Sequence, residues 1–164
     1  MRVVVMGVSG CGKTTVGQAA AAAVQAMFFD GDDLHPHTNI EKMSRGEPLT
    51  DADRAPWLVR VGQALAAEAG DVVIGCSALK HAYRDIIRAK AGAVHFVHLH
   101  APKEVLERRV NEREGHFMPP ALLDSQFAVL EHLDPTEDGV VVNIDQPFEG
   151  VVAETTAYMR SVLS

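Results

Sequence analysis

Residues 2 to 15 read R-V-V-V-M-G-V-S-G-C-G-K-T-T, an apolar run that leads into a glycine-rich turn. Gly7, Gly12, Lys13 and Thr14 occupy every fixed position of the pattern G-x-x-x-x-G-K-[ST]. Glycines let the backbone curve so that its N–H groups surround phosphate oxygens, and a helix that begins at Lys13 directs its positive end to the same place. The stretch therefore predicts a strand, a phosphate-binding loop and a helix that together bind a nucleoside triphosphate.

The side chains of this loop suit the phosphates of ATP and a magnesium ion. Lys13 supplies a mobile cation for the β and γ phosphates, and the Thr14 hydroxyl is a ligand for Mg²⁺. The expected ATP-binding residues are Gly7, Val8, Ser9, Gly10, Cys11, Gly12, Lys13, Thr14 and Thr15. The dinucleotide pattern G-x-G-x-x-G and the GTPase patterns D-x-x-G and N-K-x-D do not occur. Three classes of nucleotide-binding protein therefore stay open: a phosphotransferase, an ATPase and a nucleotide-binding sensor.

Short β-rich runs alternate with helical segments along the rest of the chain. The predicted strands, which are almost continuously apolar, are at 2–6, 27–29, 72–75, 94–99 and 140–144. The predicted helices are at 13–26, 51–69, 80–91, 102–113, 120–132 and 149–162. Continuous apolar runs are typical of strands that are buried on both faces of a parallel sheet. The pattern predicts an α/β fold of three layers in a single domain, 1–164, with a ligand site at the carboxyl ends of the strands.

Composition and charge narrow the class of protein. The net charge of −7 argues against a nucleic-acid partner, which requires a basic surface. No signal-peptide pattern opens the chain, and no apolar stretch approaches the ~20 residues that span a bilayer, so we expect no membrane partner. Two cysteines, Cys11 and Cys76, form no disulfide framework and fit a cytoplasmic location.

Three carboxylates follow the second apolar run, where residues 30–36 read D-G-D-D-L-H-P. Asp30 ends an apolar strand, as a metal-binding carboxylate does in many nucleotide-binding proteins. We expect Asp30 to hold Mg²⁺ through a water molecule, because Mg²⁺ keeps several waters in such sites. Asp32 is two residues further on, so in an extended segment its side chain lies on the same side as that of Asp30. A solvated turn is the alternative for the cluster.

Motifs along nearly the whole chain resemble the gluconokinase family. After the loop come D-G-D-D-L-H-P, N-I-E-K-M, G-E-P-L-T-D-A-D-R-A-P-W-L, C-S-A-L-K, Y-R-D-I-I-R, R-E-G-H-F-M and S-Q-F-x-x-L-E. The resemblance implies ATP-dependent phosphorylation of D-gluconate on its 6-hydroxyl, with Mg²⁺ as cofactor. It also implies a P-loop kinase fold with a five-stranded parallel sheet flanked by helices, a helical acceptor-binding section at about 34–60, a lid at about 109–122 and a homodimer. Shikimate kinases and nucleoside monophosphate kinases are similar in fold but lack these strings.

The resemblance also implies roles in catalysis. In the similar shikimate kinases the second acid of an Asp-x-Asp pair receives the proton of the acceptor hydroxyl, so we expect Asp32 to be the base or the hydroxyl-orienting group. Asp33 then remains solvated or caps a helix. Arg109 and Arg113 are four residues apart and share a helix face at the base of the lid. We expect both to neutralise charge during phosphoryl transfer, and Arg109 to contact ATP as well; an exposed helix face with salt bridges is the alternative.

The acceptor side has several candidate residues. Arg54, Lys80 and Arg84 are candidates to bind a carboxylate, and His35 and Asn39 to bind hydroxyl groups of a sugar acid. Taken singly, each of the three cations fits a solvated helix position, and only the family resemblance groups them. Trp57 fits either the core or the pocket.

Two alternatives to a gluconate kinase stay open from the sequence. One is a kinase for another small carboxylate such as shikimate, and the other is a sensor that binds ATP without turnover. The pairs Asp30/Asp32 and Arg109/Arg113 argue against the sensor. A metal site at His98 and His100, which share a strand face, is disfavoured because no cysteine or carboxylate accompanies them at a metal-ligand spacing.

Overall fold

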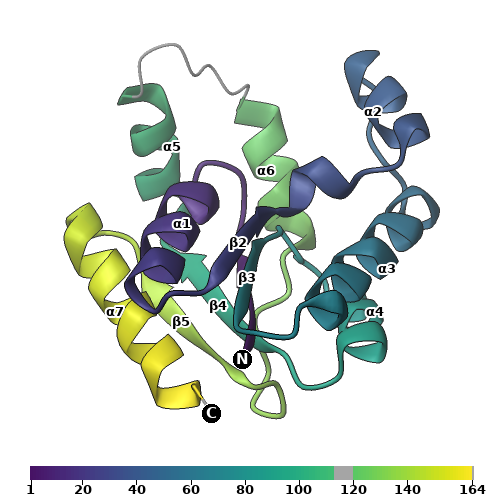
Figure 1. The fold of residues 1–164 in the computed structure, drawn as a ribbon. Helices are drawn as coiled ribbons and strands as arrows, with labels where there is room; N and C mark the ends of the chain where they lie inside the picture. The colour runs from purple at the N-terminus through teal and green to yellow at the C-terminus, as the bar shows by residue number, and fades with distance from the viewer. Residues whose placement is uncertain (113–119, 164) are drawn as a thin grey trace.

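The structure is a computed structural model that describes residues 1–112 and 120–163. Five parallel strands form one sheet in the order β2-β3-β1-β4-β5 (Figure 1). The strands are β1 (Arg2–Met6), β2 (Met27–Asp30), β3 (Val72–Gly75), β4 (His95–His100) and β5 (Gly139–Asn143). The parallel five-stranded sheet confirms the fold class expected from the sequence.

Helices cover both faces of this sheet. They are α1 (Lys13–Ala23), α2 (His37–Ser44), α3 (Asp51–Ala67), α4 (His81–Ala91), α5 (Lys103–Glu112), α6 (Pro120–Val129) and α7 (Phe148–Val162), with a short 3-10 helix, η1 (Gly31–Leu34). Figure 1 shows α1 and α7 side by side on one face and α3 and α4 on the other, while α2 projects from the body. No helix among the described residues is both long and apolar enough to cross a membrane.

The central strand shows why the strand sequences are continuously apolar. Val3 and Val5 of β1 belong to the core between the sheet and α1, α5 and α7. Val4 and Met6 belong to the core between the sheet and α3 and α4. All four side chains are 0% exposed, because alternate residues of a strand point to opposite faces and both faces are covered.

Local sequence signals account for the beginning of α3. The Thr50 hydroxyl accepts the Asp53 N–H at 3.1 Å, and the Asp53 carboxylate accepts the Thr50 N–H at 2.8 Å, which forms a capping box. Hydrogen bonds from Lys42 and then from Thr50 lower the pKa of Asp53 to about 2. Since Lys42 lies on α2, with Nζ 2.7 Å from Asp53 Oδ2, the same carboxylate also attaches the projecting α2 to α3.

Several helices differ from the expected pattern; α1, for example, ends at Ala23 rather than at residue 26. The helix α2 is missing from the helices predicted by the apolar pattern, because among its eight residues only Asn39 is buried, but it lies within the helical section at about 34–60 that the family resemblance implies. The helix α6 ends at Val129 rather than at residue 132. Beyond it, the Glu131 N–H donates to the Leu79 carbonyl at 2.7 Å, so the chain bonds to the segment after β3 instead of continuing the helix.

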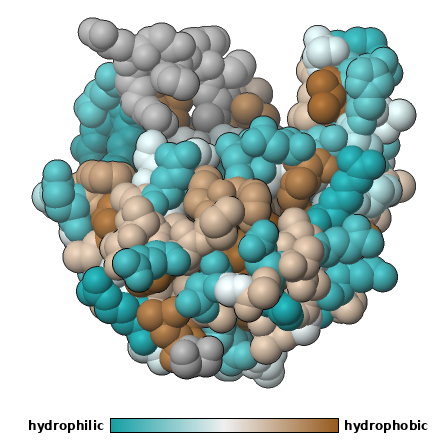
Figure 2. All heavy atoms as spheres, in the orientation of Figure 1, coloured by the Kyte–Doolittle hydropathy of each residue, from teal (hydrophilic) through white to brown (hydrophobic). Residues whose placement is uncertain are grey.

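The carboxyl ends of the strands meet at one end of the molecule. The phosphate-binding loop follows β1, the acidic segment (residues 30–36) follows β2, and Ser77 follows β3. The Ser77 carbonyl accepts the Gly7 N–H at 3.2 Å. Figure 2 shows a hollow at this end, beside the projecting α2. This arrangement gathers the predicted loop and acids where a parallel sheet places its ligands.

Candidate active site

Two glycines shape the phosphate-binding loop. Gly12 caps α1 in the left-handed conformation, with φ of 93°, which residues with a Cβ adopt only with strain. Gly7 has φ of 148°, and a Cβ there would lie 2.6 Å from Cys11 Sγ and 2.7 Å from the Leu99 carbonyl oxygen. Both positions therefore require glycine, and the loop is packed closely between β1 and β4.

Lys13 lies against the phosphate-binding loop. Its ammonium group donates to the carbonyls of Gly7 at 3.0 Å and Val8 at 3.1 Å. The hydroxyl-bearing Thr14, at the second position of α1, is exposed. The expected cation and the expected Mg²⁺ ligand thus stand next to each other at the start of α1.

A cavity of about 310 Å³ opens beside the loop. Its lining includes Gly10, Cys11, Gly12, Thr15, Val16, Arg109, Glu112, Ile144, Phe148 and Val151. Arg109 reaches it from α5, where its Nη2 donates to the carbonyls of Gln146, at 2.9 Å, and of Ile144. The structure therefore brings Arg109 to the loop. Arg113 and half of the expected lid, residues 113–119, lie outside the described residues.

The acids after β2 are arranged around η1. Asp30 Oδ1 accepts the Asp32 N–H at 2.9 Å and caps this short helix. Partial desolvation and repulsion from Asp30 raise the pKa of Asp32, although its side chain is exposed and Lys13 and His35 act in the opposite direction. Gly31 of this segment and Lys13 both lie against Gly75 at the end of β3, so the acidic segment and the start of α1 are neighbours. Asp33, one residue further on, is exposed.

Trp57 of α3 holds the acidic segment in place. It is 3% exposed, and its indole N–H donates to the Gly31 carbonyl at 2.7 Å. The His35 ring stacks on it, with centroids 4.1 Å apart. Asn39 Nδ2 lies 3.2 Å from His35 Nδ1 and donates to the Asp53 carbonyl at 2.9 Å. Trp57 is thus a core residue, and the buried His35 and Asn39 connect the acidic segment, α2 and α3.

Two of the three expected carboxylate-binding cations meet at Tyr83. The guanidinium of Arg54 lies 5.8 Å from the centre of the Tyr83 ring, and the ammonium of Lys80 lies 5.4 Å from it. Lys80 also binds both carboxylate oxygens of Asp51 at 3.2 Å, whereas one Arg54 nitrogen donates to the Leu49 carbonyl at 2.7 Å. The Tyr83 hydroxyl donates to Asp51. Hydrogen bonds from Tyr83 and then Lys80 lower the pKa of Asp51, which is consistent with a carboxylate that these groups hold in its charged form.

The structure contradicts the expectation that Arg84 binds a substrate carboxylate. Its side chain is 0% exposed and binds Glu137 through Nε at 2.7 Å and Nη2 at 3.0 Å. The remaining donors reach the carbonyls of Ala78, at 2.8 Å, and His132, at 3.3 Å. Burial raises the pKa of Glu137, but hydrogen bonds from Arg84 and Arg88 outweigh this and leave that pKa below its ordinary value. Arg84 therefore holds a carboxylate of the chain itself.

Comparison with known proteins places this site in a family. The family model described as AAA domain matches residues 3–133. The thermoresistant gluconokinase of Escherichia coli (strain K12) is 47% identical over 161 residues, which cover 96% of this chain and 92% of that protein. The chain belongs to the gluconokinase family. This result confirms the family identified from the motifs.

Solved structures agree with this assignment. The crystal structure of a gluconokinase from Sinorhizobium meliloti 1021 matches with a TM-score of 0.91 and 46% identity, over 98% of this chain and 92% of that one. A shikimate kinase from Bacteroides thetaiotaomicron matches with a TM-score of 0.69 at 19% identity, over 98% of each chain, which shows a shared fold alone. The gluconokinase strings, and not the fold, separate the two kinds of kinase.

One contact at the gluconokinase site was not assigned from the sequence. Gln126 of α6 lies in the string S-Q-F, which by itself predicts no role for this residue. Its Oε1 accepts the Ser9 N–H at 2.6 Å, and its Nε2 donates to Ser9 Oγ at 2.8 Å. The family string was the available signal, but only the folded chain shows that its glutamine reaches the phosphate-binding loop. The contacts of Tyr83 and Asp51 with Arg54 and Lys80 were likewise not predicted, because only the folded chain brings these residues together.

Proposed function

We propose that this protein transfers the γ-phosphoryl group of ATP to the 6-hydroxyl of D-gluconate, which yields 6-phospho-D-gluconate and ADP. Membership in the gluconokinase family supports the acceptor. The observation that carries the reaction type is that Lys13 and the acidic segment both pack against the end of β3: a Cβ at Gly75 would lie 3.9 Å from Lys13, and a Cβ at Gly31 would lie 2.4 Å from the Gly75 carbonyl oxygen. A donor-side cation and an acceptor-side carboxylate that share one space are what phosphoryl transfer to a hydroxyl requires.

On the donor side, Lys13 and N–H groups of the loop from Gly7 to Thr15 bind the phosphates, whereas the N–H groups of Gly7 and Ser9 donate to Ser77 and Gln126 and shape the loop. The adjacent cavity of about 310 Å³ has a volume that suits the nucleoside part of ATP. Arg109, which lines it, neutralises charge on the phosphates. The Thr14 hydroxyl and the Asp30 carboxylate provide the hard oxygen ligands that Mg²⁺ prefers, so these residues hold the ion, directly or through water. Bound Mg²⁺ neutralises charge on the phosphate oxygens.

On the acceptor side, Asp32 orients the 6-hydroxyl and accepts its proton. The raised pKa of Asp32 supports this role, because a base is more effective when its pKa is closer to the working pH. Arg54 and Lys80 remain the candidates for the gluconate carboxylate, and Arg54 is the stronger one because Lys80 already binds Asp51. His35 and Asn39 are kept as candidates for the sugar hydroxyls.

The experiment that tests this function is a coupled assay of ADP release with gluconate, with shikimate and without an acceptor. We expect rapid ADP release from ATP only when gluconate is the acceptor. Equal rates with shikimate would favour a kinase of different specificity. ATP binding without ADP release under any of the three conditions would indicate a sensor.

The proposal includes two properties of the whole protein. We infer a homodimer from the family resemblance, and light scattering during size-exclusion chromatography tests it. The two free cysteines, both buried, fit the proposed cytoplasmic location.

A further inference from the structure

Phe148 is an exposed aromatic side chain in the wall of the cavity beside the phosphate-binding loop. It is 46% exposed, and it lines this cavity together with Arg109 and Val151. Among the described residues, it is the one large apolar side chain that is both exposed and part of the cavity wall. An exposed apolar side chain within a cavity offers contact area to a ligand.

The start of α7 holds Phe148 in a defined place. The helix begins after Pro147, whose carbonyl accepts the N–H groups of Gly150 at 2.9 Å and Val151 at 3.2 Å. Val151 is three residues after Phe148 and therefore lies on the same face of the helix. Its side chain is 2% exposed and belongs to the core between the sheet and α1, α5 and α7. The helix is thus packed firmly against the body, while the Phe148 ring stays exposed at the cavity.

Arg109 brings a second flat side chain to the same cavity. Its Nη2 donates to the carbonyls of Ile144 and of Gln146, in the segment that leads into α7. These hydrogen bonds fix the guanidinium relative to the start of this helix. Aromatic rings and guanidinium planes are the side-chain surfaces on which nucleobases stack. The cavity therefore combines a phosphate-binding loop with two surfaces that suit a base.

We propose that Phe148 stacks on the nucleobase of the donor nucleotide. This assignment rests on the proposal that the cavity holds the nucleoside part of ATP. The loop residues 10–12 bind phosphates at one part of the lining, and the apolar side chains of the lining, which suit a base, are Val16, Ile144, Phe148 and Val151. An aromatic ring covers the flat face of a base and does not read its hydrogen-bonding edge. Phe148 thus contributes affinity for the nucleotide rather than a choice among bases.

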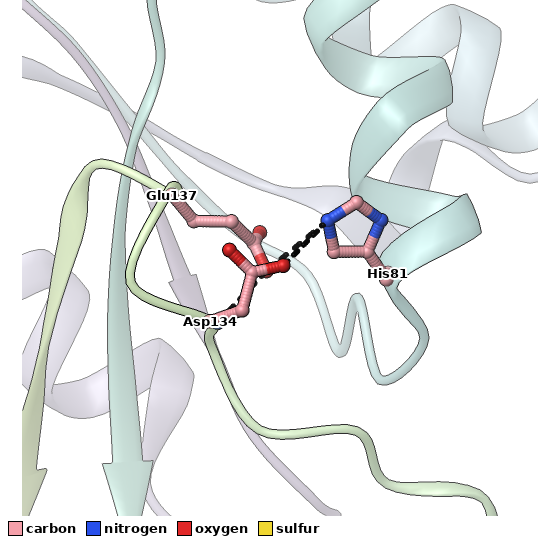
Figure 3. A group of neighbouring side chains, drawn as sticks. All are labelled: His81, Asp134 and Glu137. Carbon is pink, nitrogen blue, oxygen red and sulfur yellow. Dashed lines mark hydrogen bonds and ion pairs between the residues drawn. The ribbon is translucent and has the colours of Figure 1, made fainter.

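A group of metal-binding residue types elsewhere in the described chain is an ion-pair cluster and not a second ligand site. His81, Asp134 and Glu137 offer donor atoms that all lie within 4.8 Å of one another, and Figure 3 shows the His81 ring directed at the two carboxylates. However, Glu137 is bound by Arg84 at 2.7 Å and by Arg88 at 2.9 Å. These guanidinium groups already neutralise the carboxylate and would repel a cation.

Binding measurements without gluconate test the stack independently of turnover. Isothermal titration calorimetry compares ADP with tripolyphosphate, which carries phosphates but no base. Stacking on an aromatic side chain contributes about 5- to 150-fold in affinity, so Phe148→Ala should weaken ADP binding at least about fivefold. The same variant should bind tripolyphosphate like the wild type. Val152→Ala is the matched control, because Val152 lies one turn further along α7 and lines a neighbouring groove with Phe148 rather than the cavity. It should bind ADP like the wild type.

Two further variants separate stacking from apolar contact. Phe148→Leu keeps an apolar side chain without a flat ring and should also bind ADP more weakly. Phe148→Trp keeps a flat ring and should bind ADP at least as tightly as the wild type. Its indole emission should be quenched by ADP but not by tripolyphosphate. Trp57, the single tryptophan of the chain, is 3% exposed and provides the baseline in the wild type.

Circular dichroism verifies that each variant is folded. Unchanged ADP binding by Phe148→Ala, equal weakening of ADP and tripolyphosphate, or wild-type ADP binding by Phe148→Leu would overturn the stack while leaving the proposed kinase activity intact. A wild type that binds neither ADP nor tripolyphosphate would instead contradict the donor site itself, and the stack with it.

Discussion

Gln126 holds Ser9 by two hydrogen bonds, one to the backbone N–H at 2.6 Å and one to the side-chain hydroxyl at 2.8 Å. The two residues are 117 positions apart in the chain, and the contact attaches α6 to the phosphate-binding loop. Because a loop that binds phosphate by its N–H groups acts through its exact shape, a side chain that fixes this shape contributes to catalysis without touching the acceptor.

The first prediction concerns this contact. Gln126→Ala should lower kcat/KM for ATP about tenfold, since two hydrogen bonds contribute roughly 0.5–1.5 kcal/mol each and 1.4 kcal/mol corresponds to a factor of ten. Ser125→Ala is the matched control, because the Ser125 hydroxyl donates only to the Leu122 carbonyl of its own helix. Steady-state kinetics with varied ATP measure both variants. Equal kinetics for the two variants would show that the contact has no role in the reaction.

The second prediction separates the three acids after β2. Asp32→Asn keeps the size of the side chain but removes the base, and loss of a general base costs about 10²–10⁴ in kcat. Asp30→Asn should instead raise the Mg²⁺ concentration needed for half-maximal rate. Asp33→Asn is the control and should retain nearly full activity. If the Asp33 variant were as inactive as the Asp32 variant, the assignment of the base would be wrong.

The third prediction concerns stability and pH. The pKa of Asp32 is raised in the folded chain, so the folded state binds its proton more tightly than the unfolded state does. This acid therefore favours folding when it is protonated, at low pH, and loses that contribution as pH rises through the folded pKa. Asp32→Asn should raise the unfolding temperature at about pH 7 and leave it nearly unchanged below about pH 3, where Asp is protonated even in the unfolded chain. Thermal unfolding at both pH values decides the point. A variant that is less stable than the wild type at pH 7 would contradict it.

The fourth prediction follows from the buried pair of Arg84 and Glu137. Glu137→Leu leaves the fully buried Arg84 without its carboxylate, which should cost about 3–5 kcal/mol in the free energy of unfolding. Adding Arg84→Met to this variant should recover more than half of the loss, because no buried unpaired charge remains: Arg88, which also binds Glu137, is partly exposed and keeps its bond to Asp85 at 2.7 Å. Glu47→Leu breaks the exposed pair with Arg45, whose side chains are 57% and 51% exposed, and should change stability by less than about 1 kcal/mol. Urea unfolding compares the variants. A double variant less stable than Glu137→Leu would show that the pair is not the cause.

The sequence predicts the sheet and the loop because the signals for both are local. A strand buried on both faces needs a continuous apolar run, and a loop that binds phosphate by its backbone needs glycines at fixed positions, as β1 and Gly12 show. The acceptor side depends on contacts between distant residues. Nothing around Arg84 in the sequence indicates that Glu137, 53 residues away, occupies its guanidinium. The partners of Lys80 and Ser9 are hidden in the same way.

The proposed acceptor is a sugar acid whose carboxylate Arg54 recognises. Glucitol has the chain and hydroxyls of gluconate but no carboxylate, so it isolates this contact. Loss of one member of a buried charge pair costs roughly 2–5 kcal/mol. Arg54→Lys should regain little of this contact with gluconate, because an ammonium group lacks the planar two-pronged geometry of a guanidinium.

The most direct test is therefore kcat/KM for gluconate and for glucitol, measured with the wild type and with Arg54→Lys. We predict that the wild type uses glucitol at least about a hundredfold less efficiently, since the lost contact also displaces the 6-hydroxyl from Asp32. In Arg54→Lys the preference for gluconate should fall sharply. Equal kcat/KM for the two acceptors with the wild type would contradict both the carboxylate contact and the proposed substrate.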